Sequence, residues 1–394
     1  MSVSLWQDQN ALSIKNKLNS DIVIIGAGIA GFSTAYWLLK EDPQLKIVVL
    51  DKYSMGAGAS GRNAGFITCG SVEHFNRMVS HHGSVKAQAI WSFSEKNLEL
   101  LKEEIIDPSK NDLMFEEKGS FSLASTLEEL KQLKKSAELM KQMNIAVEVI
   151  TKNNIEARLG VQGFTGGIKY LQDASIHPMQ LVAEIKKRCS VFSGFQLLEK
   201  NEVFHMENKN DEVTINTNEY VITSNIAIMA TNGYSSLLDN YFKDKIFPTR
   251  GQILATEPVA RFMEGPCYAN FVLDYFRQLS TGELVIGGFR QLQKDTEVGF
   301  SDETSDIIQK ALEDFIKKHI PKISKAKITH RWSGVMGFSA DGQPMIGSLP
   351  SQNQVFFIGG FTAHGLGLAF HTAKCLVDLI YAREIPKFIN AKRF

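Results

Sequence analysis

Residues 26–31 read Gly-Ala-Gly-Ile-Ala-Gly, which is the glycine spacing of a dinucleotide-binding turn. Gly26 permits the tight turn, Gly28 lets the backbone approach a pyrophosphate, and Gly31 lets the following helix pack closely on the strand. The N–H groups of the first helical turn, among them those of Ile29 and Ala30, then point at the phosphates. The turn therefore predicts an ADP-containing redox cofactor.

An acidic residue follows at the distance typical of such folds. Asp51 lies about 20 residues beyond Gly31, at the end of an apolar run, where a carboxylate accepts hydrogen bonds from the adenosine ribose hydroxyls. The same carboxylate would repel a 2′-phosphate, which argues against NADP. NAD and FAD share this fingerprint, so these residues leave the choice between the two open.

The elements that must position these residues stand on both sides of the turn. Residues 21–25 are β-branched and predict a buried parallel strand, and the apolar spacing of residues 29–39 predicts a helix that ends before Pro43. Residues 56–61 repeat the glycine pattern, but no amphipathic run follows them, and they are interpreted as a flexible loop. No second complete fingerprint and no C-x-x-C pair is present, which indicates one dinucleotide and electrons taken from the substrate.

The composition is that of an ordinary globular protein. The chain has 394 residues, enough for two domains, and its 43 basic and 43 acidic residues cancel. Balanced charge gives no electrostatic reason to expect nucleic acid or an anionic membrane as a partner. The four cysteines are widely spaced, and no Cys/His cluster has metal-ligand spacing, so reduced thiols and no metal are expected.

The expected cellular location rests on two features that the sequence lacks. No apolar run reaches the roughly 18 residues of a membrane-spanning helix, and the first residues have no apolar signal-peptide core. We therefore expect a cytoplasmic protein that does not act at a membrane. The sequence contains no signal for an oligomeric state.

Two further glycine-rich segments complete the pattern. Residues 58–67 read Gly-Ala-Ser-Gly-Arg-Asn-Ala-Gly-Phe-Ile, and residues 359–367 read Gly-Gly-Phe-Thr-Ala-His-Gly-Leu-Gly, between an apolar strand and the last helix. In this order, with the first turn and Asp51, they resemble the D-amino acid oxidase (DAO) superfamily of FAD-dependent oxidoreductases. The resemblance extends from Ser4 to Ile380. Residues 230–234, 248–252 and 331–347 look most similar to the γ-glutamylputrescine oxidase-like and glycine oxidase-like amine oxidases.

The resemblance implies an α/β fold of two interleaved domains. A Rossmann-like FAD-binding domain is expected to contain residues 1–75, 150–240 and 325–394. An antiparallel-sheet substrate domain is expected to contain residues 76–149 and 241–324. This is the arrangement of the DAO and glutathione-reductase-like FAD folds.

The resemblance also implies which residues hold the flavin. In addition to the first turn and Asp51, it places these at the cofactor: Lys52, Ala59, Ser60, Arg62, Asn63, Ala64, Gly65, Val203, Ala230, Thr231, Asn232, Gly233, Gly334, Gly360, Phe361, Thr362, Ala363, His364, Gly365 and Leu366. His364 is expected beside the ring, where a partial positive charge would stabilise the reduced flavin anion. Backbone N–H groups at the start of the last helix suit the flavin C2 carbonyl.

Few residues are expected to take part in the chemistry. His364, Arg62 and Arg277 are the catalytic candidates, and Arg250, Arg277 and Arg331 are candidates for binding a substrate carboxylate, which a guanidinium fork matches. Trp332 is a candidate for the pocket wall. Amine oxidation by a flavin needs an unprotonated nitrogen and a C–H bond held over flavin N5, so no catalytic base is required.

Two positions differ from sarcosine oxidase-like members. Those proteins attach FAD to a cysteine, and the matching position here is Gly334, so a non-covalent FAD is expected. They also have a lysine that promotes reaction with oxygen, and residues 283–286 contain none. The second difference leaves oxidase and dehydrogenase both open.

The leading prediction is oxidation of the C–N bond of a primary or secondary amine or amino acid to an imine. The expected partners are a small-molecule amine and oxygen, or another electron acceptor, with H2O2 as the product of oxygen. The first alternative is a dehydrogenase of a hydroxy acid or polyol phosphate. A second is oxidation of an amine on a modified tRNA base, which the neutral composition disfavours, and a third is FAD binding without turnover.

Overall fold

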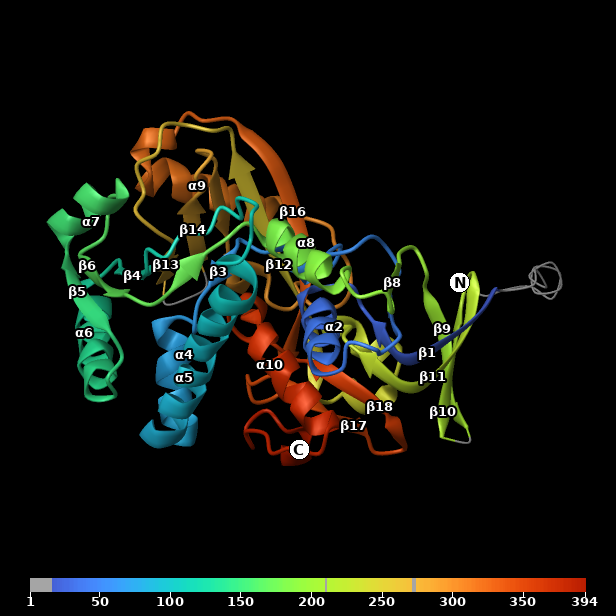
Figure 1. The fold of residues 1–394 in the computed structure, drawn as a ribbon. Coiled ribbons are helices and arrows are strands. Elements are labelled where there is room, and N and C mark those ends of the chain that lie inside the picture. Colours follow the sequence, from blue (N-terminus) through green and yellow to red (C-terminus); the bar gives the residue numbers. More distant parts are fainter. Residues whose placement is uncertain (1–15, 210, 271–273) are drawn as a thin grey trace.

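The computed structural model describes residues 16–209, 211–270 and 274–394 (Figure 1). Ser4, where the family resemblance begins, lies outside them. Two eight-stranded sheets and one two-stranded sheet contain the strands of the described residues. The expected fold class is confirmed, because a mostly parallel sheet covered by helices stands beside a mostly antiparallel one.

The first sheet has the strand order of a dinucleotide-binding fold, β17-β18-β11-β1-β2-β8, with β10 and β9 added beside β11. Its strands are β1 (Asn16–Ile25), β2 (Ile47–Leu50), β8 (Phe195–Leu198), β9 (Val203–Lys209), β10 (Glu212–Thr217), β11 (Tyr220–Met229), β17 (Met345–Leu349) and β18 (Gln352–Gly359). β1 pairs in parallel with both β2 and β11, and β18 pairs in parallel with β11. The strand predicted at residues 21–25 is therefore confirmed, at the centre of this sheet.

Three helices cover one face of the first sheet: α2 (Ile29–Glu41), α8 (Pro178–Cys189) and α10 (Gly365–Ile380). α2 lies between α8 and α10, and Trp37 Nε1 donates to the carbonyl of Phe370 at 3.0 Å. Alternate strand residues such as Ile24 face these helices, whereas Val23 faces the β9–β10 side. Both faces are buried, as a parallel sheet requires.

The second sheet has the order β16-β12-β15-β14-β13-β4-β6-β5, antiparallel except where β13 meets β4. Its strands are β4 (Ser120–Ala124), β5 (Val147–Thr151), β6 (Gly166–Tyr170), β12 (Ile246–Thr256), β13 (Cys267–Ala269), β14 (Asp274–Gln278), β15 (Leu284–Gly287) and β16 (Ile328–Ser339). α9 (Asp306–His319) packs on one face through Leu312 and Phe315. α6 (Leu127–Gln142) and α7 (Lys152–Leu159) lie at the far end, opposite β9–β11 (Figure 1).

Short elements join the two sheets. β3 (Phe66–Ile67) pairs with β7 (Ala174–Ser175), and α4 (Val72–His82) and α5 (Ser84–Leu101) follow β3. The described residues also contain short helical turns. These are the π-turn Lys102–Ile106 and the 3-10 turns Asn232–Leu237, Asn240–Phe242, Arg290–Gln293, Pro321–Ile323 and Ala391–Arg393. Residues 59–62 form the short helix α3 (Ala59–Arg62) where a flexible loop was expected. The side-chain amide of Asn63 donates to the carbonyls of Ala59 and Ser60, and these hydrogen bonds stabilise the short helix.

Sheet membership differs from the expected domain boundaries in two places. β6 was expected in the FAD-binding part, but it pairs with β4 and β5 in the second sheet. β16 was also expected there, but it pairs along β12 from Ser339 to Ile328. Both strands find their hydrogen-bonding partners in the other sheet, and this was not visible from sequence order. As a division into domains, the prediction stays a proposal.

Within the described ranges, the helices are too short or too polar to cross a bilayer.

Candidate cofactor site

The first glycine turn is so tight that side chains would not fit. Gly26 has φ +116°, and a Cβ there would lie 2.7 Å from the carbonyl oxygen of Ala230. A Cβ on Gly31 would lie 1.9 Å from the carbonyl oxygen of Gly26, and one on Gly28 would lie 2.7 Å from Ser60 Oγ. The geometry agrees with the roles expected of these glycines in the turn and in helix–strand packing.

Asp51 lies beside this turn, at the carboxyl end of β2. One carboxylate oxygen accepts from the N–H of Ala27 and the other from the N–H of Tyr53, both at 2.8 Å. Burial raises the pKa of Asp51, and the two N–H donors oppose that effect. Each carboxylate oxygen has two lone pairs, so acceptor capacity remains for a ribose hydroxyl. The N–H of Asn201 donates to the Asp51 carbonyl at 2.8 Å, which brings the start of β9, at Val203, to the same place.

The segment around α3 lies at the N-terminus of α2. Ser60 Oγ accepts from the N–H of Ile29 at 2.9 Å. Asn63 donates to the carbonyls of Ala59 and Ser60 and accepts from the N–H of Gly65, so its side chain sets the path of the turn. Lys52 is farther out, in an exposed ion pair of 2.7 Å with Glu202.

Arg62 is occupied by backbone carbonyls. Its guanidinium donates to the carbonyls of Ala57 and Ser333, both at 2.9 Å, and its own carbonyl accepts from Trp332 Nε1 at 2.9 Å. A Cβ on Gly334 would lie 3.0 Å from Arg62 Cβ. Arg62 and Trp332 thus connect α3 to β16, a structural task that the sequence did not indicate. The catalytic role of Arg62 stays a prediction.

The turn after β11 holds the closing loop, residues 359–364. Asn232 Oδ1 accepts from the N–H of Gly360 at 2.9 Å, and the N–H of Thr362 donates to the Gly337 carbonyl at 2.9 Å. A Cβ on Gly233 would lie 3.0 Å from the Met336 carbonyl oxygen. The structure therefore brings together three segments that the sequence placed at the cofactor.

The closing loop is conformationally strained. Thr362 and Ala363 have φ +49° and +67°, a region that residues with a Cβ rarely adopt. Such residues cost roughly 1–3 kcal/mol each and concentrate at ligand-binding segments. From α5, Asn97 donates to the carbonyl of Leu366 and Ser94 donates to that of Gly367, which fixes the start of α10 directly after the strained loop.

His364 is neutral near pH 7, and its expected role beside the flavin stays a prediction. Burial, together with the charge of Arg77, lowers its pKa to about 4. Since the imidazole is uncharged, its contribution to a reduced flavin would be that of an N–H dipole. Its ring lies against the ring of His74, with centroids 4.8 Å apart.

The arrangement fits a long, doubly anchored dinucleotide. α2 and α10 lie side by side, and each begins directly after a glycine-rich turn at the carboxyl ends of the parallel strands. Neither N-cap residue, Gly28 or His364, supplies a side-chain cap. The first N–H groups of a helix have no intrahelical partners and carry partial positive charge. Ser60 Oγ takes the N–H of Ile29, contrary to expectation, so the other free N–H groups at the start of α2 can meet a pyrophosphate and those of α10 the flavin ring.

Comparison with known proteins agrees with a dinucleotide-binding fold. The family model described as "FAD dependent oxidoreductase", DAO, matches residues 21–379. The chain belongs to this family. Oxidoreductases of the DAO family use FAD, and FAD is the cofactor of this flavoenzyme. The sequence-based recognition is confirmed.

Relatives of the flavoenzyme oxidise amines or amino acids where their names state an activity. It is 25% identical to the probable oxidoreductase OrdL of Haemophilus influenzae, over 92% of this chain and 83% of that protein. It is 22% identical to gamma-glutamylputrescine oxidoreductase of Escherichia coli, over 97% and 89%. The crystal structure of glycine oxidase from Geobacillus kaustophilus superposes with a TM-score of 0.80 at 20% identity, over 93% and 96%. That likeness supports the fold.

Two of the three candidate arginines of this DAO-family member form ion pairs with glutamates. Arg250 pairs with the buried Glu297, with Nη2 2.6 Å from Oε1. Arg331 donates to Gln309 and Glu313 of α9. Arg331 thus extends toward α9, and Arg250 extends toward the segment that precedes α9. The structure therefore does not bring them to the closing loop.

Arg277 is the third, and it extends from β14 toward β3 and β7. Its side chain is 5% exposed, and it donates to the carbonyls of Gly65 at 3.3 Å and Ile176 at 2.9 Å. Within the described ranges its Nε has no hydrogen-bond partner, and the Glu116 carboxylate attracts the guanidinium without forming an ion pair with it. Burial lowers its pKa to about 10. A buried guanidinium without an anion is a place where an anionic ligand would be stabilised.

Several residues near the closing loop were not found from the sequence. On the same side as Arg277, Phe66 contacts the rings of Tyr268 and Tyr275 with centroids 5.4 and 5.9 Å apart. His74 lies against His364, and its only sequence signal is Ser71, a helix cap three residues before it. These contacts join distant elements, so no local spacing reports them.

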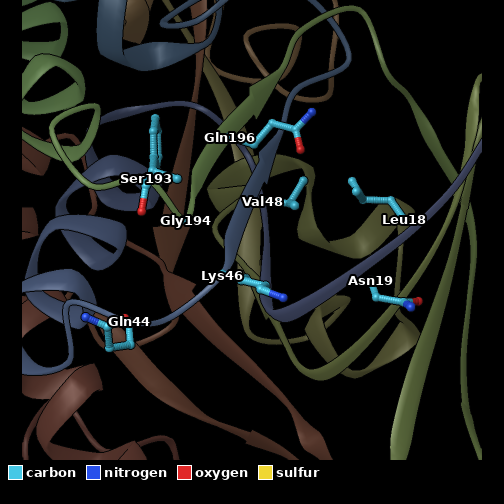
Figure 2. A pocket seen from close by; sticks show the side chains of 9 residues that line it. Leu18, Asn19, Gln44, Lys46, Val48, Ser193, Gly194 and Gln196 are labelled. Atoms are coloured by element: carbon cyan, nitrogen blue, oxygen red, sulfur yellow. The ribbon is translucent and has the colours of Figure 1, made fainter.

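A cavity of about 370 Å³ lies elsewhere on the first sheet (Figure 2). Its lining consists of Leu18, Asn19, Gln44, Lys46, Val48, Ser193, Gly194, Phe195 and Gln196. Lys46 and Gly194 directly precede β2 and β8, so the cavity lies at the amino ends of these strands. Ligands of such sheets bind outside the carboxyl ends, and we do not assign the cofactor to this cavity.

Proposed function

We propose that the protein oxidises the C–N bond of a primary or secondary amine or amino acid, with Arg277 binding the substrate carboxylate where one is present. The imine product then hydrolyses to a carbonyl compound and an amine or ammonia. Bound FAD supplies the acceptor for the hydride, at N5 of its ring. Oxygen is the proposed electron acceptor, and its reduction gives H2O2.

The observation that supports this proposal is the unpaired guanidinium of Arg277. It is buried on the side of the second sheet that faces β3, and its Nε–H is directed to no acceptor within the described ranges. A carboxylate would gain a charge-assisted hydrogen bond there and would offset the cost of the buried charge. On the same side of the sheet, Phe66 packs against Tyr268 and Tyr275, and this aromatic surface would exclude water from an uncharged amine.

The choice of nitrogen over oxygen rests on the relatives. A hydroxy acid has the same carboxylate, so Arg277 alone does not separate the two substrate classes. The relatives named for a reaction are a gamma-glutamylputrescine oxidoreductase and a glycine oxidase, which act on amines. This favours an amine over a hydroxy acid or polyol phosphate, and over a tRNA base.

Anaerobic bleaching of the flavin tests the proposal. The purified holoenzyme is mixed with matched panels of amines, amino acids and hydroxy acids, and the loss of the oxidised flavin absorbance is followed. We expect amines or amino acids to bleach it. Bleaching by hydroxy acids alone would overturn the choice of nitrogen.

A substitution at Arg277 tests the carboxylate contact. For an amino-acid substrate, Arg277→Met is expected to raise the substrate Kd by about tenfold to a hundredfold, since a charge-assisted pair contributes about 1.5–3 kcal/mol. Arg331→Met, a matched change on the other face, should leave the Kd unchanged. Equal effects of the two substitutions would contradict the assignment.

The compartment is also proposed. The four cysteines are buried free thiols, and burial raises the pKa of Cys69 and Cys267 well above the ordinary thiol value. Thiols without disulfides suit a reducing compartment, and we propose the cytoplasm.

A further inference from the structure

A second histidine lies against His364 and belongs to none of the glycine-rich motifs. His74 stands in the first turn of α4, with a side chain that is 3% exposed. Its ring centroid is 4.8 Å from that of His364, with an angle of 42° between the ring planes. Elements at opposite ends of the chain thus bring two imidazoles together at the closing loop.

The backbone before α4 is shaped around the His74 ring. Gly70 has φ +121°, and a Cβ there would lie 2.6 Å from His74 Cδ2. Ser71 caps the helix, with its Oγ accepting from the N–H of His74 at 3.3 Å. Glycine at position 70 is therefore required both by the backbone conformation and by the ring that packs on it.

One hydrogen bond determines the tautomer of His74. Arg77 Nη2 lies 3.0 Å from His74 Nδ1. A guanidinium donates and never accepts, so Nδ1 is the acceptor and the proton of the neutral ring is on Nε2. Burial agrees, because it lowers the pKa of His74 well below the ordinary value, with the neighbouring His364 and Arg77 adding to the effect. Glu73 lies 3.5 Å from the other amino group of Arg77 and helps to fix the guanidinium.

We propose that His74 is a positioning residue, held by Arg77 as the Nε2–H tautomer, whose ring fixes the orientation of His364 beside the flavin. The inference rests on the proposed function, because His364 can affect flavin reduction only if a substrate reduces the flavin. His74 acts through His364 and makes no contact of its own with the substrate. Loss of the Arg77 hydrogen bond frees the His74 ring to rotate, and His364 then loses its fixed support.

Side-chain 15N NMR of the histidine-labelled holoenzyme tests the first part. The wild type should show His74 with an unprotonated Nδ1 and a protonated Nε2. Arg77→Met should remove this preference and give averaged shifts, while Arg77→Lys, which keeps a donor, should retain it. A protonated Nδ1 in the wild type, or an unchanged tautomer in Arg77→Met, would overturn the proposal.

Flavin spectra and reduction rates test the second part. His74→Phe keeps an aromatic ring but removes the bond to Arg77, so the visible spectrum of the bound flavin should shift. The rate of anaerobic reduction at saturating substrate should fall roughly tenfold, with substrate Kd within about twofold of wild type. An unchanged spectrum together with an unchanged rate would contradict the proposal. If no amine reduces the wild-type flavin, the proposed function fails, and the NMR and spectral results still decide the role of His74.

Discussion

The carboxylate of Glu297 accepts three hydrogen bonds from side chains of β12. It is fully buried, and it accepts from Arg250 at 2.6 and 3.1 Å and from Gln252 at 2.9 Å. Glu297→Ala should lower the free energy of unfolding by about 3–5 kcal/mol, because it leaves the guanidinium buried without an anion. Urea denaturation measures this. Glu313→Ala, which removes the exposed partner of Arg331, should cost less than about 1 kcal/mol, and similar losses for both would contradict the argument.

The ion pairs of Glu264 make stability depend on pH. Arg158 bonds this carboxylate through Nε at 2.6 Å, Lys169 lies at 2.8 Å, and these cations lower the pKa of Glu264 from about 4.5 to about 2. Because the native pKa is lower than the unfolded one, the ionised carboxylate stabilises the native state above about pH 4.5. That contribution is lost as the pH falls toward 2. Glu264→Gln should therefore be less stable than wild type at pH 7, with a difference that shrinks between pH 4.5 and 2. A difference independent of pH would exclude the mechanism.

At the scale of elements, the two glycine patterns of the chain provide a matched experiment. Gly31 packs α2 on β1 with no room for a Cβ, whereas a Cβ on Gly58 would meet nothing within 4 Å. Gly31→Ala should lose FAD binding and unfold at a lower temperature, because the helix must move off the strand. Gly58→Ala should bind FAD as the wild type does. Flavin content and thermal melting report both, and an equal loss of stability in Gly58→Ala would contradict the steric argument.

The same elements show what the sequence was able to predict. The strand–turn–helix at residues 21–41 follows from local spacing alone: buried β-branched residues, glycines with no space for a side chain, and a helix that ends before Pro43. The face from which Arg250 or Arg331 extends depends on the register of β12 against β16, and local spacing does not report register. The contact of His74 with His364 depends on how α4 packs against the closing loop. The fold was therefore predictable from motifs, while the pairing of side chains required the tertiary structure.

At the scale of the whole molecule, the proposed FAD site is built from segments that lie far apart in the chain. The cofactor is expected to be non-covalent, since Gly334 stands where related enzymes have a cysteine. Acid precipitation should leave the yellow chromophore in the supernatant. Free FAD at about 100 times its Kd should stabilise the apoprotein by about 2.7 kcal/mol and raise its melting temperature. Flavin that stays with the precipitate would show a covalent bond.

The packing of α2 on α10 also has a consequence for the nascent chain. Trp37 and Phe370, which pack together, are 333 positions apart, and β1 pairs with β11 from the middle of the sequence. While the ribosome is still translating, the first glycine turn has its strand but lacks both the neighbouring helix and the closing loop. FAD can therefore be held at both ends only after the last helix has left the exit tunnel. A prematurely terminated chain would expose the apolar face of α2 and become a substrate for chaperones and proteases.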